Sequence, residues 1–344
     1  MRIAVVHNAV GDESAPDERD VLVQADAVAE ALQQLGHQPV RLACTLDLAA
    51  VQDRLREIEP DVVFNLVESL NGQGSLIHLF PALLDAIGVP YTGSGSPAVY
   101  LTSHKILAKQ AMAAADLATP PWIGPYPPEM PTLGRPDQSA PVAKAEGPQT
   151  KWILKSLWEH ASVGINEDEL VLSDDTVQVQ KLLKQKAPQL GGACYAEAYV
   201  DGREFNLSLL AGPEDPQVLP PAEIIFQDYP ADKLRIVGYR AKWEPESFEY
   251  KHTPRCFDFA PHDTPLLGKL AAVAQRCWRV FALSGYARID FRVDGRGQPW
   301  ILEINANPCL SPDAGFAAAV AKSGLNFGAA VERILSAAQT RSKR

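Results

Sequence analysis

The chain has 344 residues, 46% of them apolar, which is enough to build the cores of two or three domains. Its formal net charge of −10 argues against nucleic acid or an anionic membrane surface as a partner, because both would repel an acidic protein. The sequence starts directly with a strand pattern, has no apolar run of membrane-spanning length, and carries five scattered cysteines without a CxxC spacing. We therefore expect a cytoplasmic protein without a disulfide framework or a zinc site.

The first hundred residues alternate strand and helix patterns. The expected elements are strands at 3–7, 38–43 and 62–66, and helices at about 20–35 and 49–58. This βαβ order predicts a small parallel sheet. A glycine-containing stretch at 88–95 predicts one more short strand followed by a turn.

The middle of the chain is interrupted by residues 124–149, which are rich in proline and have no apolar period. We expect this insert to be a loop without a catalytic role. Around and after the insert, helices are expected at 105–115, about 174–186, 265–281 and 327–338. Strands are expected at 151–155, 194–200, 203–210, 287–293 and 300–305. The segment 227–263 is expected to be irregular.

The strand pair at 287–293 and 300–305 is joined by the polar, glycine-rich residues 294–299, which is typical of a hairpin. If all six connecting residues form a symmetric loop, Val293 faces Trp300. The remaining pairs then follow by counting back along both strands. A one-residue bulge would break this register.

Four polar side chains then lie on one face of the pair, with Arg288 opposite Asn305 and Asp290 opposite Glu303. Two adjacent buried carboxylates repel each other unless a cation lies between them, and Mg²⁺ prefers a few carboxylate oxygens together with nucleotide phosphates. Arg288 would stabilise negative charge on a phosphoryl group. The pattern favours a Mg-ATP site, and the alternative is an exposed hairpin with cross-strand charge pairs.

The chain resembles the ATP-grasp superfamily, and within it the D-alanine:D-alanine ligase branch. The resemblance is carried, in family order, by motifs at 91–95, Lys155 with 162–164, Glu197 with 201–205, 286–291 and 302–305. It implies an α/β (α+β) ATP-grasp fold with an N-terminal βαβ (pre-ATP-grasp) parallel-sheet domain. The implied division is an N-terminal domain at 1–101, a central subdomain at 102–196 that holds the insert, and a C-terminal catalytic subdomain at 197–340.

The resemblance also implies a role for each matching residue. The implied ATP-binding residues are Lys105, Lys155, Ser162, Glu197, Tyr199, Val200 and Glu204. The two lysines and the turn at Ser162 would bind the phosphates. The implied metal ligands are Asp290, Glu303 and Asn305, which would hold two Mg²⁺ ions, with Mn²⁺ as an alternative. Arg288 would act on the acyl phosphate or the tetrahedral intermediate, and Glu18 would act beside it.

The implied reaction phosphorylates a carboxylate with ATP, and a nucleophile such as an amine then attacks the acyl phosphate. We therefore expect a carboxylate–amine ligase that acts on small amino-acid or peptide substrates, and a homodimer, as is common in this family. A small-molecule kinase of the same fold and a non-catalytic nucleotide-binding protein are the alternatives.

The chain departs from the family pattern where the amino acids would bind. Ala161 stands in place of a serine and Trp243 in place of a tyrosine, so Glu18 lacks two usual partners. Tyr239 and Tyr250 are the candidates for supplying the missing hydroxyl. The lysine before Trp243, Lys242, is kept and is an expected substrate contact.

Further on, Cys309 and Ala314 replace the glycine and serine that recognise the carboxylate of the second D-alanine. Asp313 could instead bind an ammonium group. Glu68 follows the third strand, where the family usually has a histidine and a glycine. These changes predict a substrate pair other than D-alanine plus D-alanine.

Overall fold

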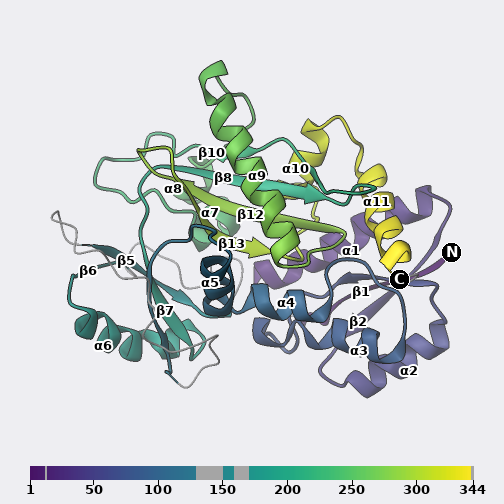
Figure 1. Cartoon of the computed structure of the whole chain (residues 1–344). Coiled ribbons are helices and arrows are strands. Elements are labelled where there is room, and N and C mark those ends of the chain that lie inside the picture. Colours follow the sequence, from purple (N-terminus) through teal and green to yellow (C-terminus); the bar gives the residue numbers. More distant parts are fainter. Residues whose placement is uncertain (12–13, 129–149, 159–169, 342–344) are drawn as a thin grey trace.

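The computed structural model describes residues 1–11, 14–128, 150–158 and 170–341 (Figure 1). Within these ranges the strands form three sheets, and helices cover them. None of the helices that the structure describes combines the length and the apolar character needed to cross a membrane.

The N-terminal part is a parallel sheet with strand order β2-β1-β3. Its strands are β1 (Arg2–Asn8), β2 (Gln38–Cys44) and β3 (Val62–Leu66), and its helices are α1 (Pro16–Gln34), α2 (Leu48–Ile58) and α3 (Leu79–Ile87). Because side chains alternate along a strand, Ile3 and Val5 pack in one core, whereas Ala4 and Val6 pack in another on the opposite face. The predicted parallel sheet is confirmed. The strand expected within 88–95 is wrong, since only an isolated bridge between Val63 and Tyr91 forms there.

The middle part is an antiparallel sheet of order β4-β7-β5-β6. It contains β4 (Trp122–Tyr126), β5 (Lys151–Ser156), β6 (Leu170–Leu172) and β7 (Cys194–Ala198), and it follows helices α4 (Ser96–Ser103) and α5 (Lys105–Ala114). Helix α6 (Thr176–Lys186) packs Val179 and Leu183 against this sheet. The predicted start of the insert at 124 is wrong, because β4 continues to Tyr126 and uses Pro125 in its interior. Residues 129–149 of the insert lie outside the described residues.

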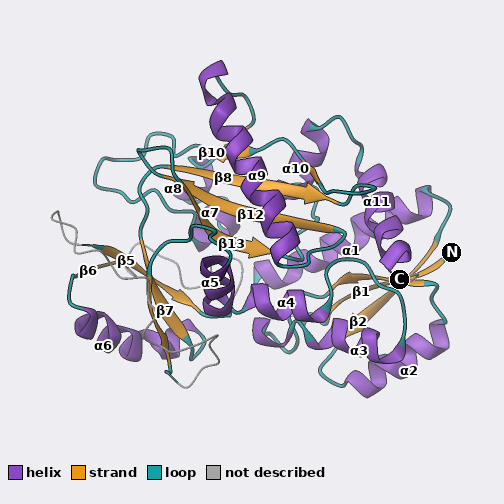
Figure 2. Cartoon of the chain, viewed as in Figure 1, coloured by secondary structure: helices purple, strands orange, loops and turns teal. Residues whose placement is uncertain are grey.

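The largest sheet has the order β11-β10-β8-β12-β13, and β9 pairs with β8 (Figure 2). Its strands are β8 (Arg203–Leu210), β9 (Gln217–Val218), β10 (Ala222–Ile224), β11 (Arg255–Cys256), β12 (Tyr286–Val293) and β13 (Pro299–Asn305). Helix α9 (Thr264–Val280) covers the face that carries Phe205, Leu207 and Ile289. The opposite face carries polar side chains. The segment 227–263, expected to be irregular, contains α7 (Tyr239–Trp243), α8 (Phe248–Lys251) and β11.

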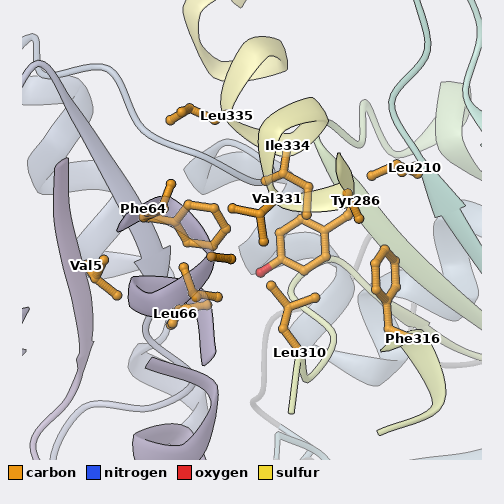
Figure 3. Packing of buried hydrophobic residues seen from close by; sticks show 14 of the residues in the cluster. Val5, Phe64, Leu66, Leu210, Tyr286, Leu310, Phe316, Val331, Ile334 and Leu335 are labelled. Atoms are coloured by element: carbon orange, nitrogen blue, oxygen red, sulfur yellow. The ribbon is translucent and has the colours of Figure 1, made fainter. Parts of the chain in front are cut away.

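The last two helices, α10 (Gly315–Lys322) and α11 (Phe327–Arg341), return to the N-terminal sheet. Figure 3 shows Val331 and Ile334 of α11 beside Phe64 of β3 and Tyr286 of β12. All four side chains have no solvent exposure. The first strands and the last helix therefore share one core, while the predicted division into three parts stays a prediction.

Candidate active site

A cavity of 680 Å³ is lined by residues of all three sheets. Every predicted site residue in the described part of the chain lines it. These residues are Glu18, Lys105, Lys155, Glu197, Tyr199, Val200, Glu204, Lys242, Arg288, Asp290, Glu303, Asn305 and Asp313. Ser162, with the neighbouring Ala161, lies outside the described residues. The chain thus brings side chains from positions 18 to 313 around one space.

The register of β12 and β13 places Arg288 opposite Asn305 and Asp290 opposite Glu303, as predicted. The predicted pairing of Val293 with Trp300 is wrong, because Val293 faces Pro299. The connecting loop is therefore one residue shorter on the β13 side. The pairing also shifts by one residue beyond Asp290, where β13 has an extra residue at Leu302. The two differences cancel, which leaves the four polar residues in the predicted pairs.

Asp290 is the centre of a hydrogen-bond network on this face. Arg288 donates from Nε to Oδ1 at 2.8 Å and from Nη2 to Oδ2 at 2.9 Å. Asn305 donates to Oδ2 at 3.2 Å, and Asn206 of β8 donates to Oδ1 at 2.8 Å. Burial alone would lower the pKa of Arg288, but the charge of Asp290 raises it overall, so Arg288 stays protonated. Sequence reasoning missed Asn206, although its polar position between Phe205 and Leu207 was a signal.

The donor set at this end fits Mg²⁺ by its chemistry. Asp290 and Glu303 offer carboxylate oxygens and Asn305 offers an amide oxygen, which are the ligand types that Mg²⁺ prefers. Glu303 Oε1 also lies 3.5 Å from Nζ of Lys105. The described residues contain no group of three or more His, Cys, Asp or Glu side chains that could hold a metal. A metal bound here would therefore need further oxygens, such as those of ATP phosphates and water.

Glu197 lies between two lysines at the wall of the cavity. Its Oε2 is 2.7 Å from Nζ of Lys109, its Oε1 accepts a hydrogen bond from Lys155, and the side chains of Glu197 and Lys109 are each 1% exposed. Burial would raise the pKa of Glu197, but the two ammonium groups lower it overall. Burial lowers the pKa of Lys109 to about 8, although Glu197 opposes this change. Sequence reasoning missed Lys109, whose one signal was its i, i+4 spacing from Lys105 on α5.

The turn between β7 and β8 brings Tyr199, Val200 and Glu204 to the cavity. Glu204 Oε2 lies 3.0 Å from Nη2 of Arg292, a residue of β12 that sequence reasoning also missed. In the turn, Gly202 has φ +142°, and a Cβ atom there would lie 2.0 Å from the carbonyl oxygen of Val293. Only glycine fits this close approach.

Glu18 lies in the first turn of α1, which begins at Pro16 rather than near residue 20. The hydroxyl of Tyr239 donates to Oδ1 of Asp17 at 3.0 Å, so this tyrosine contacts the neighbour of Glu18. Tyr250 also lines the cavity. Neither tyrosine forms a hydrogen bond to Glu18 among the described residues.

Two further carboxylates, Asp20 and Glu68, line the same end of the cavity. Ser311 Oγ donates to Asp20 Oδ1 at 2.8 Å, and the thiol of Cys309 donates to Oδ2 at 2.9 Å. Gln24 donates to Glu68 Oε1 at 2.7 Å. Burial raises the pKa of Glu68 to about 7. The pKa of the Cys309 thiol is also raised, first by burial and then by the nearby charge of Glu68, so the thiol stays protonated.

Lys242 and Asp313, the predicted substrate contacts, line the cavity together with Arg255 of β11. Nη1 of Arg255 donates to the backbone carbonyl of Asp313 at 2.9 Å. Burial, and then the charge of Arg288, lowers the pKa of Lys242. Arg255 was missed because the two-residue strand that carries it is too short to show a period.

The model of the family described as D-ala D-ala ligase C-terminus matches residues 141–336. A D-alanine–D-alanine ligase of Moorella thermoacetica is 30% identical over 350 residues, covering 98% of this chain and 99% of the relative. The "Uncharacterized protein y4sG" of Sinorhizobium fredii is 29% identical over 324 residues, and the match covers 92% of this chain and 88% of that protein. The crystal structure of D-alanine–D-alanine ligase from Bacillus anthracis complexed with ATP superposes on this chain with a TM-score of 0.72 at 18% identity. The match covers 100% of this chain and 99% of that chain, so the two share a fold. The chain therefore belongs to the D-alanine–D-alanine ligase family and is an ATP-dependent ATP-grasp ligase that forms carbon–nitrogen bonds.

Proposed function

We propose that this ligase joins the carboxylate of one small amino-acid or peptide substrate to the amine of another, and that the pair is not D-alanine plus D-alanine. The family membership supports the reaction class. The residues that line the cavity beyond Asp290 and Glu303 support the change in substrate.

The observation that carries the change is the acidic wall formed by Asp20 and Glu68. Both carboxylates are held by neutral donors, namely Ser311, Cys309 and Gln24, and among the described residues neither forms an ion pair. Carboxylates that line a partly closed cavity favour a cationic partner or additional hydrogen-bond donors. The methyl side chain of D-alanine offers neither. A substrate with an amine or hydroxyl on its side chain would complement this wall.

The proposed roles follow the family resemblance, and all of these residues line the cavity. Lys105 and Lys155 would bind ATP phosphates, and Glu197, with the backbone of Tyr199 and Val200, would bind adenine. Glu204 would hold the ribose.

Arg288 would neutralise charge on the transferred phosphoryl group, held in place by its two hydrogen bonds to Asp290. Asp290, Glu303 and Asn305 would hold Mg²⁺, which lowers the charge on the phosphates when bound. Glu18, Lys242 and Asp313 would orient the amino-acid substrates.

We further propose that the enzyme is a cytoplasmic homodimer with no nucleic-acid or membrane partner. The family resemblance supports the dimer, and the acidic charge supports the lack of anionic partners. Light scattering of the purified chain would measure its mass. A monomer across micromolar concentrations would contradict the dimer.

The experiment that tests the substrate proposal measures ADP and phosphate release with a panel of D- and L-amino acids, singly and in pairs, with mass spectrometry of the products. We expect an amide product with a substrate whose side chain carries an amine or hydroxyl, and little turnover with D-alanine alone. Robust turnover with D-alanine alone would contradict the proposal. A stable phosphorylated product without an amide would instead indicate a kinase.

A second experiment tests the metal assignment. Glu303→Gln removes one carboxylate charge with little change in shape, so we expect it to abolish ATP turnover and to leave the circular dichroism spectrum unchanged. The matched control is Glu332→Gln, an exposed change on α11 outside the cavity. Near-normal turnover of Glu303→Gln would refute the proposed metal ligand.

A further inference from the structure

Arg255 is a cationic side chain of the cavity that the proposed ATP and metal sites do not use. It begins β11 and pairs with Ile224 at the edge of the largest sheet. Its side chain lines the cavity and is exposed to solvent. None of the family-like motifs named in the sequence analysis includes this position.

The guanidinium of Arg255 lies over the loop that leads into α10. Nη1 donates to the carbonyl of Asp313 at 2.9 Å, and a Cβ atom at Gly315 would lie 3.6 Å from its Nε. The loop residue between them, Ala314, has no side-chain donor. Arg255 therefore supplies hydrogen-bond donors at the place where the loop itself lacks them.

Most of the donors of Arg255 have no acceptor among the residues that the structure describes. A guanidinium has five N–H donors, and within this part of the chain Arg255 donates to one neutral carbonyl oxygen. Among the residues that the structure describes, no carboxylate forms an ion pair with Arg255. Burial, and then the positive charge of Arg288, lowers the pKa of Arg255, although the charge of the Asp313 carboxylate opposes this change. An anion bound beside Arg255 would offset the repulsion from Arg288 that remains.

Arg288 and Arg255 differ in how they are compensated. Arg288 makes a two-point ion pair with Asp290 and belongs to the phosphate end of the cavity. Arg255 has no such partner, and it lies beside the uncapped start of α10, where backbone N–H groups add positive potential. A planar carboxylate matches the fork of a free guanidinium.

We propose that Arg255 is a specificity-determining residue that binds the carboxylate of the amine-bearing substrate, so that the acceptor is an amino acid or peptide with a free carboxylate. This inference rests on the proposed function only in that the second substrate is an amine. The Arg255 guanidinium, from β11, would take the place of the hydroxyl that the family carries at the position of Ala314, as a charged donor that can make two hydrogen bonds.

The test compares each acceptor with its primary amide, which removes the carboxylate charge and keeps the amine. The probes are D-alanine with D-alaninamide, and the most active acceptor of the panel with its amide. A charge-assisted, two-point contact predicts that the wild type prefers the acid by about 10- to 100-fold in kcat/KM. In Arg255→Gln we expect this preference to disappear because turnover of the acid falls, while turnover of the amide and the KM for ATP stay within about twofold. Arg255→Lys should restore part of the preference.

The matched control is Arg279→Gln on α9, an exposed arginine whose Nε donates to the carbonyl of Gln275. It should keep the wild-type preference for the acid. The inference is overturned if the wild type uses the amide as well as the acid, if Arg255→Gln keeps the preference, or if its main effect is on the KM for ATP. D-alanine is among the probes, so the substrate proposal can fail while this inference is still tested on the D-alanine pair.

Discussion

Replacing Lys109 by methionine is expected to destabilise the protein by about 3 kcal/mol, because the change leaves a buried carboxylate with one cation instead of two. Lys109 Nζ lies 2.7 Å from Glu197 Oε2, and the same ammonium donates to Thr119 Oγ1 at 2.8 Å and to the carbonyl of Pro120 at 3.0 Å. Removing one partner of a buried pair costs about 3–5 kcal/mol, and the lower end applies because Lys155 still contacts Glu197. Methionine nearly fills the space, so little of the loss comes from a cavity.

Urea unfolding at pH 7, followed by tryptophan fluorescence, would measure this loss. The second variant combines Lys109→Met with Glu197→Gln, which removes both charges of the pair. We expect it to be at least about 1 kcal/mol more stable than Lys109→Met alone, since the uncompensated charge is gone.

The control, Lys184→Met, changes an exposed lysine of α6 and should alter stability by less than about 0.5 kcal/mol. A loss below about 1 kcal/mol for Lys109→Met, or a double variant no more stable than the single one, would refute the reasoning.

Three more predictions concern the cavity wall and its supports. Burial raises the pKa of Glu68 from 4.5 to about 7, so the folded state binds an extra proton between these pH values and the wild type loses stability as pH rises through them. Glu68→Gln should remove about 1–3 kcal/mol of this loss. The prediction is contradicted if the urea midpoint shifts equally in both proteins between pH 5 and pH 8. Gly202→Ala should lower stability by about 2–4 kcal/mol in urea unfolding, since its Cβ atom would lie 2.0 Å from the carbonyl oxygen of Val293; a loss under about 0.5 kcal/mol would show that the turn relaxes freely. Asn206→Ala removes the 2.8 Å donor to Asp290 and should raise the KM for Mg-ATP about tenfold with an unchanged circular dichroism spectrum; an unchanged KM would argue against a supporting role.

The sequence predicts the parallel sheet and the polar face of the strand pair because both depend on local periodicity. Ile3 to Val6 are apolar in succession, which is typical of a strand buried on both faces, and this strand is confirmed. The pairing of Asp290 with Glu303 is also confirmed, although a short loop and a bulge at Leu302 had to offset each other. Counting along a hairpin cannot detect either deviation, since both arise from how the backbone closes.

The missed residues depend on contacts between distant parts of the chain. Lys109 alone has the pattern of a surface cation on a helix. Its burial becomes apparent only when Glu197 of β7 lies 2.7 Å away. Arg292 is similar, because its ion pair with Glu204 joins β12 to β8. Arg255 lies on a two-residue strand within a stretch that has no regular pattern. Long-range pairing, and not residue type, gives these side chains their roles.

The core that joins β1 and β3 to α11 sets an order on the folding of this chain. Phe64 is buried against Val331 and Ile334, which are more than 260 positions later in the sequence. During synthesis, the N-terminal sheet can pair its strands early, but α1 covers only part of one apolar face, and the rest is exposed until the segment 327–341 has left the ribosome. A ribosome-bound fragment that ends before residue 327 should therefore be more sensitive to proteases than the released chain.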